Sequence, residues 1–144
     1  MIDVFLKKYP NAPTILVVED EALLREMECS ILEQSGYNVL SAESGRRAFD
    51  LWKSQGQKVD LLLADIILPR GITGVELGKC LLEGQPGLKI IFTTGRLVGQ
   101  AEHEELARMN ARFLPKPFQP EDLVYLVRDT LGAADSGVAS VSVA

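Results

Sequence analysis

Reactive side chains stand at the ends of four apolar runs of the sequence. An acidic triplet, EDE at 19–21, follows the first run, and a single carboxylate, Asp65, ends the run LLLAD. A hydroxyl and an ammonium group, on Thr94 and Lys116, follow the later runs KIIFT and RFLP. Because Asp and Glu are almost never fully buried unless they are paired, Asp65 needs a partner or a chemical task.

These groups can carry out phosphoryl chemistry if they are gathered at one place. Two carboxylates near 4 Å repel by about 4 kcal/mol at an effective dielectric near 20, so Asp20 and Asp65 need a cation beside them. Carboxylate oxygens are ligands for Mg²⁺, which can draw in a phosphate group and neutralise the charge that develops on transfer. Lys116 and the Thr94 hydroxyl would then hold phosphoryl oxygens, and Asp65 would be the nucleophile that forms an aspartyl phosphate.

The elements that must position these groups are short apolar strands alternating with helices. Strands are predicted at 14–18, 38–42, 59–65, 88–95 and 111–115, and helices at 21–36, 44–56, 73–84, 97–110 and 120–131. Ser44 is a predicted helix N-cap, and Thr73 and Glu76 have the spacing of a capping box. The first helix is supported by apolar residues at a spacing of four: Leu23, Met27 and Ile31.

Five strand-then-helix units in a row predict an α/β fold, an open parallel sheet with helices on both faces. Ligands of such folds bind at the carboxyl ends of the strands. The residues at 19–21, 65, 94 and 116 are therefore expected at one edge of the sheet.

The motifs VVEDE, DIILP, FTTG and KPF, in this order and spacing, resemble the receiver domain of bacterial two-component response regulators, the CheY-like family. The resemblance covers residues 14–131. It implies a single-domain, doubly wound, five-stranded parallel sheet of flavodoxin-like strand order 2-1-3-4-5. Residues 1–13 would then be an N-terminal extension, and residues 132–144, small and without periodicity, a disordered tail.

The resemblance also implies the roles of the site residues. Asp65 would be the phosphoacceptor, with Mg²⁺ held by Asp20, Asp65 and the main-chain carbonyl of Ile67, and with Glu19 assisting. Lys116 would be the charge partner of the phosphoryl group, and the bond from Lys116 to Pro117 would be cis. Two switch residues complete the set: Thr94 and Phe113.

The function that the resemblance implies is that of a signalling module in a phosphorelay and not that of an enzyme. A phosphoryl group would pass from the phosphohistidine of a histidine kinase or histidine phosphotransfer domain to Asp65. The face made by the fourth helix, fifth strand and fifth helix would change in response, and a homodimer through that face is a further expectation.

Two departures from the family pattern refine this expectation. The loop LPRGITG is one residue longer than the common form, as in receivers attached to hybrid histidine kinases. Ile67 and Arg96 occupy positions that tune the lifetime of the aspartyl phosphate. Because neither carries an amide or carboxylate to position an attacking water, slow self-dephosphorylation is predicted.

Composition excludes several other classes. The 144 residues suit one domain, and the net charge of −5 without a basic run argues against nucleic-acid binding. No stretch has the roughly 18 apolar residues of a membrane span, and the N-terminus does not resemble a signal peptide, so a cytoplasmic location is expected. Cys29 and Cys80 have no metal or redox spacing and are expected to be reduced thiols.

Particular residues argue against rival functions from other classes of protein. A phosphatase of the haloacid dehalogenase type would need an acid at position 67, where the chain has Ile67. A flavin-binding domain would need a hydroxyl-rich phosphate loop after the first strand, where the chain has three acids. A receiver that binds partners without phosphorylation, and the receiver portion of a hybrid histidine kinase, stay open as alternatives.

Overall fold

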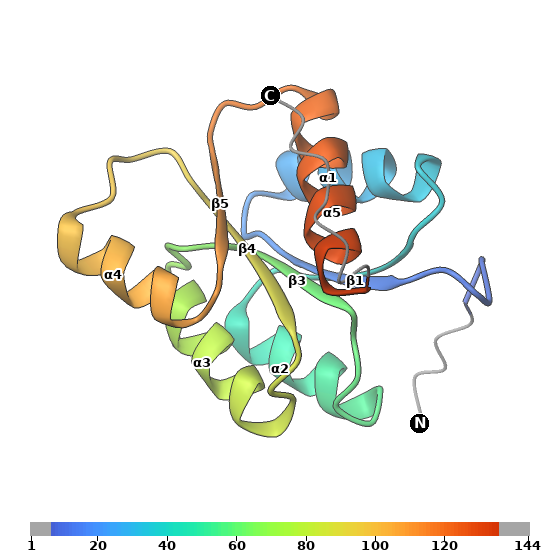
Figure 1. Ribbon diagram of the computed structural model, residues 1–144, viewed down its shortest axis with the longest axis horizontal. Helices are drawn as coiled ribbons and strands as arrows, with labels where there is room; N and C mark the ends of the chain where they lie inside the picture. The colour runs from blue at the N-terminus through green and yellow to red at the C-terminus, as the bar shows by residue number, and fades with distance from the viewer. Residues whose placement is uncertain (1–6, 136–144) are drawn as a thin grey trace.

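The computed structural model describes residues 7–135 and has the predicted α/β architecture (Figure 1). The strands are β1 (Thr14–Val18), β2 (Asn38–Ala42), β3 (Leu61–Asp65), β4 (Lys89–Thr94) and β5 (Arg112–Pro115). The helices are α1 (Ala22–Gln34), α2 (Gly45–Ser54), α3 (Gly74–Gly84), α4 (Gln100–Arg108) and α5 (Pro120–Asp135). All pairings are parallel and the strand order is β2-β1-β3-β4-β5, as predicted.

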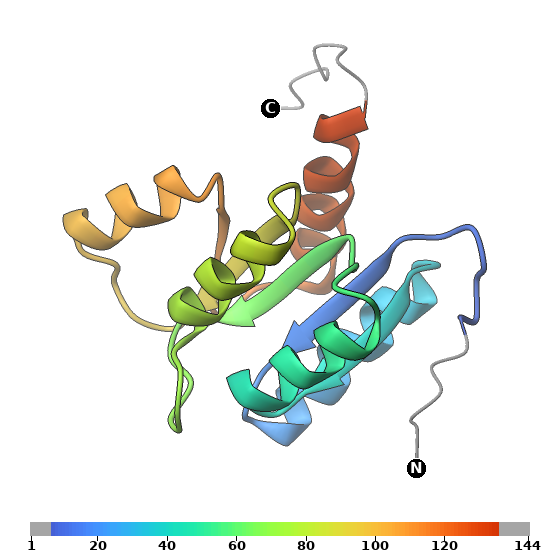
Figure 2. The same cartoon turned by 90° about the horizontal axis from the view of Figure 1, so that it is seen from below.

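Helices cover both faces of the sheet. α1 and α5 lie together on one face, and α2 and α3 on the other, as Figures 1 and 2 show. Strand β1 illustrates how the core is divided, because successive side chains point to opposite faces. Leu16 and Val18 pack into the cluster under α2 and α3, whereas Ile15 and Val17 pack into the cluster under α1 and α5.

The predicted helix starts are confirmed at α2 and α3 and corrected at α4. Ser44 accepts a hydrogen bond from the amide of Arg47, and Thr73 and Glu76 form the reciprocal bonds of a capping box. Helix α4 begins at Gln100 and not at 97. The side chain of Glu102 accepts a hydrogen bond from the backbone amide of Gly99, which makes Gly99 the N-cap and places the first turn after it.

Helix α1 is confirmed, but the apolar spacing of four does not mark its buried face. Leu23 is 77% exposed and Met27 is 42% exposed. The buried residues of the helix are Leu32 and the charged Glu28. The helix therefore turns a mixed face toward the sheet and leaves apolar side chains on its outer face.

Helix α5 continues to Asp135, beyond the predicted end at 131. Gly132 does not stop the helix because it is followed by two alanines, the strongest helix formers. The predictions for residues 1–6 and 136–144 concern segments outside the described residues. The described part of the N-terminal extension is tied to β2, since Asn38 exchanges side-chain hydrogen bonds with the backbone of Tyr9.

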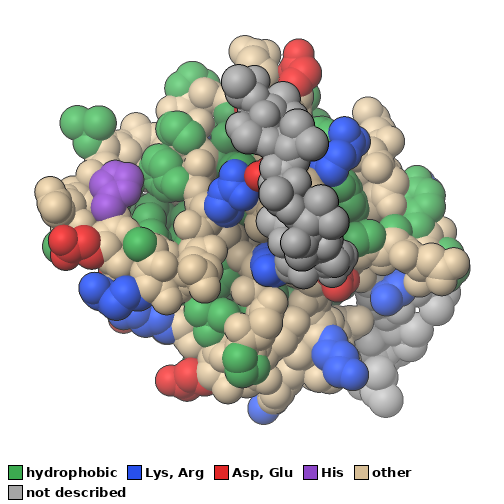
Figure 3. Space-filling view, viewed as in Figure 1, with side chains coloured by type: hydrophobic (Ala, Val, Ile, Leu, Met, Phe, Trp, Pro, Cys, Tyr) green, Lys and Arg blue, Asp and Glu red, His purple; other side chains and the backbone are tan. Residues whose placement is uncertain are grey.

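Within residues 7–135, no helix has the length and apolar character needed to cross a bilayer. Both cysteines are free. On the face drawn in Figure 3, acidic and basic side chains are interspersed among apolar and neutral ones.

Candidate functional site

The predicted acidic group assembles at the carboxyl edge of the sheet. Glu19 and Asp20 follow β1, and Asp65 ends the neighbouring strand β3. One carboxylate oxygen from each of the three residues lies within 4.8 Å of the others. Glu19 and Asp65 are buried, whereas Asp20 is exposed, so the group is open to solvent on the side of Asp20.

Lys116 bridges two of these carboxylates. Its ammonium group donates to Asp65 Oδ2 at 2.7 Å and to Glu19 Oε1 at 2.9 Å. The lysine follows β5, its backbone amide donates to the carbonyl of Thr94 at 2.8 Å, and the Lys116–Pro117 bond is cis as predicted. Burial alone would lower the pKa of Lys116, but its hydrogen bonds to Asp65 and Glu19 outweigh burial and raise it.

The carboxylate of Asp65 is fixed through both oxygens. Oδ1 accepts a hydrogen bond from the backbone amide of Ile67 at 2.9 Å, and Oδ2 accepts from Lys116. The backbone of Asp65 is also closely packed, against Gly74. A Cβ placed on Gly74 would lie 2.0 Å from the Asp65 carbonyl oxygen. The start of α3 therefore rests directly on the strand end that carries Asp65.

The charges of the site fit a divalent cation. Among the side chains of Glu19, Asp20, Asp65 and Lys116, three carboxylates face one ammonium group, so this group of four has an excess of negative charge. Burial raises the pKa of Glu19, although Lys116 acts to lower it. The negative charge of Glu19 is therefore unfavourable at this buried position. Oxygen ligands with negative charge are the donor set that Mg²⁺ prefers, so the residues present suit this ion.

Thr94 and Ile67 border the same hollow as Asp20 and Asp65. Thr94 is buried at the end of β4, and its hydroxyl accepts a hydrogen bond from the amide of Arg96 at 3.3 Å. The predicted residues at positions 20, 65, 67 and 94 thus border one hollow. Lys116 is bonded to Asp65, and Glu19 is connected to Asp65 through Lys116.

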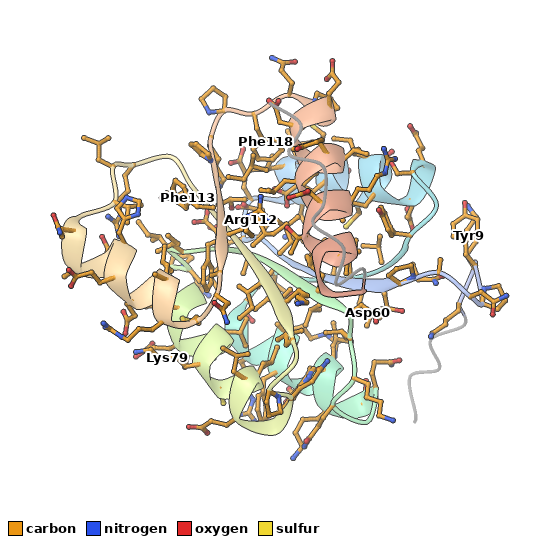
Figure 4. All side chains as sticks on the ribbon, viewed as in Figure 1. Tyr9, Asp60, Lys79, Arg112, Phe113 and Phe118 are labelled. Carbon is orange, nitrogen blue, oxygen red and sulfur yellow. The ribbon has the colours of Figure 1, made fainter. Side chains whose placement is uncertain are left out.

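Phe113 lies apart from this hollow, on β5 beside α4. It is half-buried against the core and meets the ring of His103 edge-on, with 6.2 Å between ring centroids. Figure 4 shows it pointing from β5 toward α4. The strand register pairs Phe113 with Phe92, two residues before Thr94, so the two predicted switch residues lie on adjacent strands.

Three features of the site were missed by sequence reasoning. Gly74 was seen only as part of a helix start, although its lack of a side chain is what allows α3 to contact Asp65. Arg96 forms a bidentate ion pair with Glu102 in the first turn of α4. The third is the burial of Glu28 in α1, which the apolar spacing of this helix does not indicate.

Glu28 is only 1% exposed, and its Oε2 has no hydrogen-bond partner among the described residues. Burial raises its pKa to about 8, helped by the negative charges of Glu19 and Asp65 and opposed by Lys116. An acid with this pKa is mostly protonated at neutral pH. The site therefore has a neutral carboxyl group within electrostatic range of its charged residues.

Comparisons with known proteins identify the family of the chain. The family model for the response regulator receiver domain matches residues 15–128. The chain is 35% identical over 120 residues to the response regulator receiver protein CpdR of Brucella abortus (strain 2308), a match that covers 83% of this chain and 98% of that protein. It is also 32% identical over 125 residues to the sensor kinase CckA of the same organism, a match that covers 87% of this chain but 13% of the kinase.

Solved structures show the same fold. A CheY-like receiver domain protein from Methanospirillum hungatei JF-1 superposes with a TM-score of 0.76 at 28% sequence identity. The match covers 85% of this chain and 96% of that one.

Proposed function

The chain belongs to the response regulator receiver family of two-component systems, and from this premise we propose that Asp65 accepts a phosphoryl group in a phosphorelay. The observation that carries the proposal is the position of Lys116, whose ammonium group lies 2.7 Å from Asp65 inside the acidic group. A lysine held there can neutralise phosphoryl oxygens as they arrive.

The chain's own residues account for the transfer step. A carboxylate oxygen of Asp65 attacks the phosphorus of a phosphohistidine, the new P–O bond forms, and the P–N bond breaks with its electron pair going to the imidazole nitrogen. The amide of Ile67 and the ammonium group of Lys116 hold the carboxylate in place before attack. Positioning and charge neutralisation supply most of the catalysis of phosphoryl transfer.

Mg²⁺ is the proposed cofactor. The carboxylates of Asp20 and Asp65 and the main-chain carbonyl of Ile67 would hold it, with Glu19 assisting, and these residues border or adjoin one hollow. When bound, the ion supplies positive charge for the transferring phosphoryl oxygens.

The proposed output is a change in the α4-β5-α5 face. A phosphoryl group on Asp65 would draw the Thr94 hydroxyl toward it, and Phe113 on the adjacent strand would follow into the vacated space. Both side chains are placed for this coupling, since they lie on paired strands and Phe113 contacts α4 through His103. The same face is the proposed surface of a homodimer.

The proposed phosphodonor is a histidine kinase or a histidine phosphotransfer domain. The chain is proposed to promote its own phosphorylation and dephosphorylation without acting on another substrate, and the cytoplasm stays its predicted location. The resemblance to the receiver of CckA supports a kinase-linked partner, and the receiver portion of a hybrid kinase remains the alternative setting.

A receiver that works only by binding is the second candidate function. It is disfavoured because the structure brings the acceptor, the acidic group and the lysine together. The test is a set of two-dimensional amide NMR spectra of wild type and Asp65→Asn, recorded with Mg²⁺ before and after addition of beryllium fluoride, a phosphoryl analogue. Shifts at α4, β5 and α5 in wild type alone are expected. Identical spectra with and without the analogue would favour the binding-only receiver.

A further inference from the structure

Arg96 stands between the phosphoacceptor site and helix α4. It borders the hollow that contains Asp65 and Thr94, and it also borders a second hollow between α3 and α4 that contains Glu102. Its backbone amide donates to the Thr94 hydroxyl at 3.3 Å. One exposed arginine is thus adjacent both to the reacting carboxylate and to the helix whose face is proposed to change.

The guanidinium group of Arg96 is engaged with α4. Its two terminal nitrogens donate to the two carboxylate oxygens of Glu102 at 3.0 and 2.6 Å, and Nη1 also donates to the carbonyl of Leu97 at 2.9 Å. The carboxylate of Glu102 in turn accepts a hydrogen bond from the backbone amide of Gly99, the N-cap residue of α4. The first turn of α4 is therefore held by a carboxylate whose partner is Arg96.

This ion pair can be exchanged for a stronger one. Both side chains are partly exposed, and exposed ion pairs contribute little to stability. A phosphoryl group carries about two negative charges and more acceptor oxygens than a carboxylate. A guanidinium group binds such an oxyanion through two parallel hydrogen bonds, as it now binds Glu102.

We propose that Arg96 exchanges Glu102 for the phosphoryl group when Asp65 is phosphorylated, and that this exchange releases the first turn of α4. The inference rests on the proposed function and adds a second connection from Asp65 to α4, made by the side chain of Arg96 and not by the side chains of Thr94 and Phe113. Because coupling is reciprocal, weakening the Arg96–Glu102 pair must stabilise the phosphoryl-bound form.

The test is a double-mutant cycle on the affinity of the Mg²⁺-loaded protein for beryllium fluoride, measured by ¹⁹F NMR. The variants are Glu102→Gln, Arg96→Gln and the double variant. The control is Lys79→Gln. Lys79, labelled on α3 in Figure 4, pairs with Glu105 of α4 in the same second hollow, and neither residue lines the hollow that contains Asp65.

Glu102→Gln is expected to bind the analogue about three- to tenfold more tightly than wild type, because Arg96 is released in advance. In the Arg96→Gln background the same change is expected to have no effect, and Lys79→Gln is expected to match wild type. An equal effect of Glu102→Gln in both backgrounds, or the same gain from Lys79→Gln, would overturn the exchange. Absence of binding in wild type would overturn the proposed function itself.

A second measurement follows the arginine directly. The Nε–H signal of Arg96, assigned by its loss in Arg96→Gln, is expected to move when the analogue binds wild type and to stay in place in Asp65→Asn. An Arg96 signal that is unchanged while the amides near Asp65 shift would show that the arginine keeps Glu102, contrary to the proposal.

Discussion

Gly74 lies so close to Asp65 that no side chain fits between them. A Cβ on Gly74 would stand 2.0 Å from the carbonyl oxygen of Asp65 and 2.9 Å from its carbonyl carbon. Both atoms belong to the backbone and cannot rotate away. The first turn of α3 therefore lies directly against the backbone of Asp65, and a side chain at position 74 would force the two apart.

Replacing Gly74 with alanine is expected to lower the free energy of unfolding by about 1–3 kcal/mol or more, because overpacking against backbone forces a shift of the chain. Chemical denaturation measures this change. Gly87→Ala is the matched control, since nothing lies within 4 Å of a Cβ there, and it is expected to be nearly neutral. Equal stabilities of the two variants would contradict the close contact.

Removing the charge of Lys116 is expected to separate metal binding from phosphoryl transfer. The ammonium group that is bonded to Asp65 would repel a divalent ion held by the same carboxylate, so Lys116→Met should bind Mg²⁺ up to about tenfold more tightly. The same variant should be phosphorylated much more slowly, because the arriving phosphoryl oxygens lose their cation.

Calorimetric titration with Mg²⁺ and phosphorylation rates measure the two effects of Lys116→Met. Lys89→Met, at the opposite end of the sheet where β4 begins, should change neither. Weaker Mg²⁺ binding by Lys116→Met would show that the lysine is needed to assemble the acidic group and not to complement its charge.

The buried carboxyl group of Glu28 is expected to make stability depend on pH. Its pKa is about 8 in the folded chain, against an ordinary value of 4.5. Between these values the unfolded chain has released the proton and the folded chain has kept it, so the free energy of unfolding falls by about 1.4 kcal/mol per pH unit as pH rises. This contribution is fully present below pH 4.5 and is lost as pH approaches 8.

Glu28→Gln removes this dependence, so its stability relative to wild type should increase steadily from pH 5 to pH 8. Urea denaturation at several pH values measures the difference. Glu26→Gln, an exposed position of the same helix, should differ from wild type by a constant amount. A constant difference for Glu28→Gln as well would mean that Glu28 titrates normally.

The phosphorylated form of the chain is expected to be long-lived. Ile67 is exposed beside Asp65 and offers no group to orient an attacking water. Ile67→Asn, which adds such a group, should shorten the lifetime several-fold. Loss of the phosphoryl mass followed over time measures both lifetimes, and decay of the wild type within seconds would refute the prediction.

Much of the architecture was predictable from local patterns. The strands were identified by continuous apolar runs, and the carboxyl-edge rule correctly brought residues from β1, β3 and β5 to one site. The capping box at Thr73 and Glu76 was predictable because its hydrogen bonds join residues three apart.

Prediction from the sequence failed for residues whose roles depend on contacts with other elements of the fold. The spacing of Leu23 and Met27 predicted a helix, but only packing against the sheet and α5 decides that Glu28 and Leu32 face inward. The Arg96–Glu102 pair depends on where α4 begins, which in turn depends on Glu102 capping at Gly99. No local signal distinguishes Gly74 from an ordinary residue at a helix start.

Acceptance of a phosphoryl group by Asp65 in a metal-dependent reaction is the function proposed for the chain. Its most direct test is the intact mass of the protein after incubation with phosphoramidate or acetyl phosphate, with and without Mg²⁺, beside an Asp65→Asn control. Wild type is expected to gain one phosphoryl group with Mg²⁺, and no gain is expected in the control or without the metal. No gain in wild type with either donor, or an equal gain in Asp65→Asn, would contradict it.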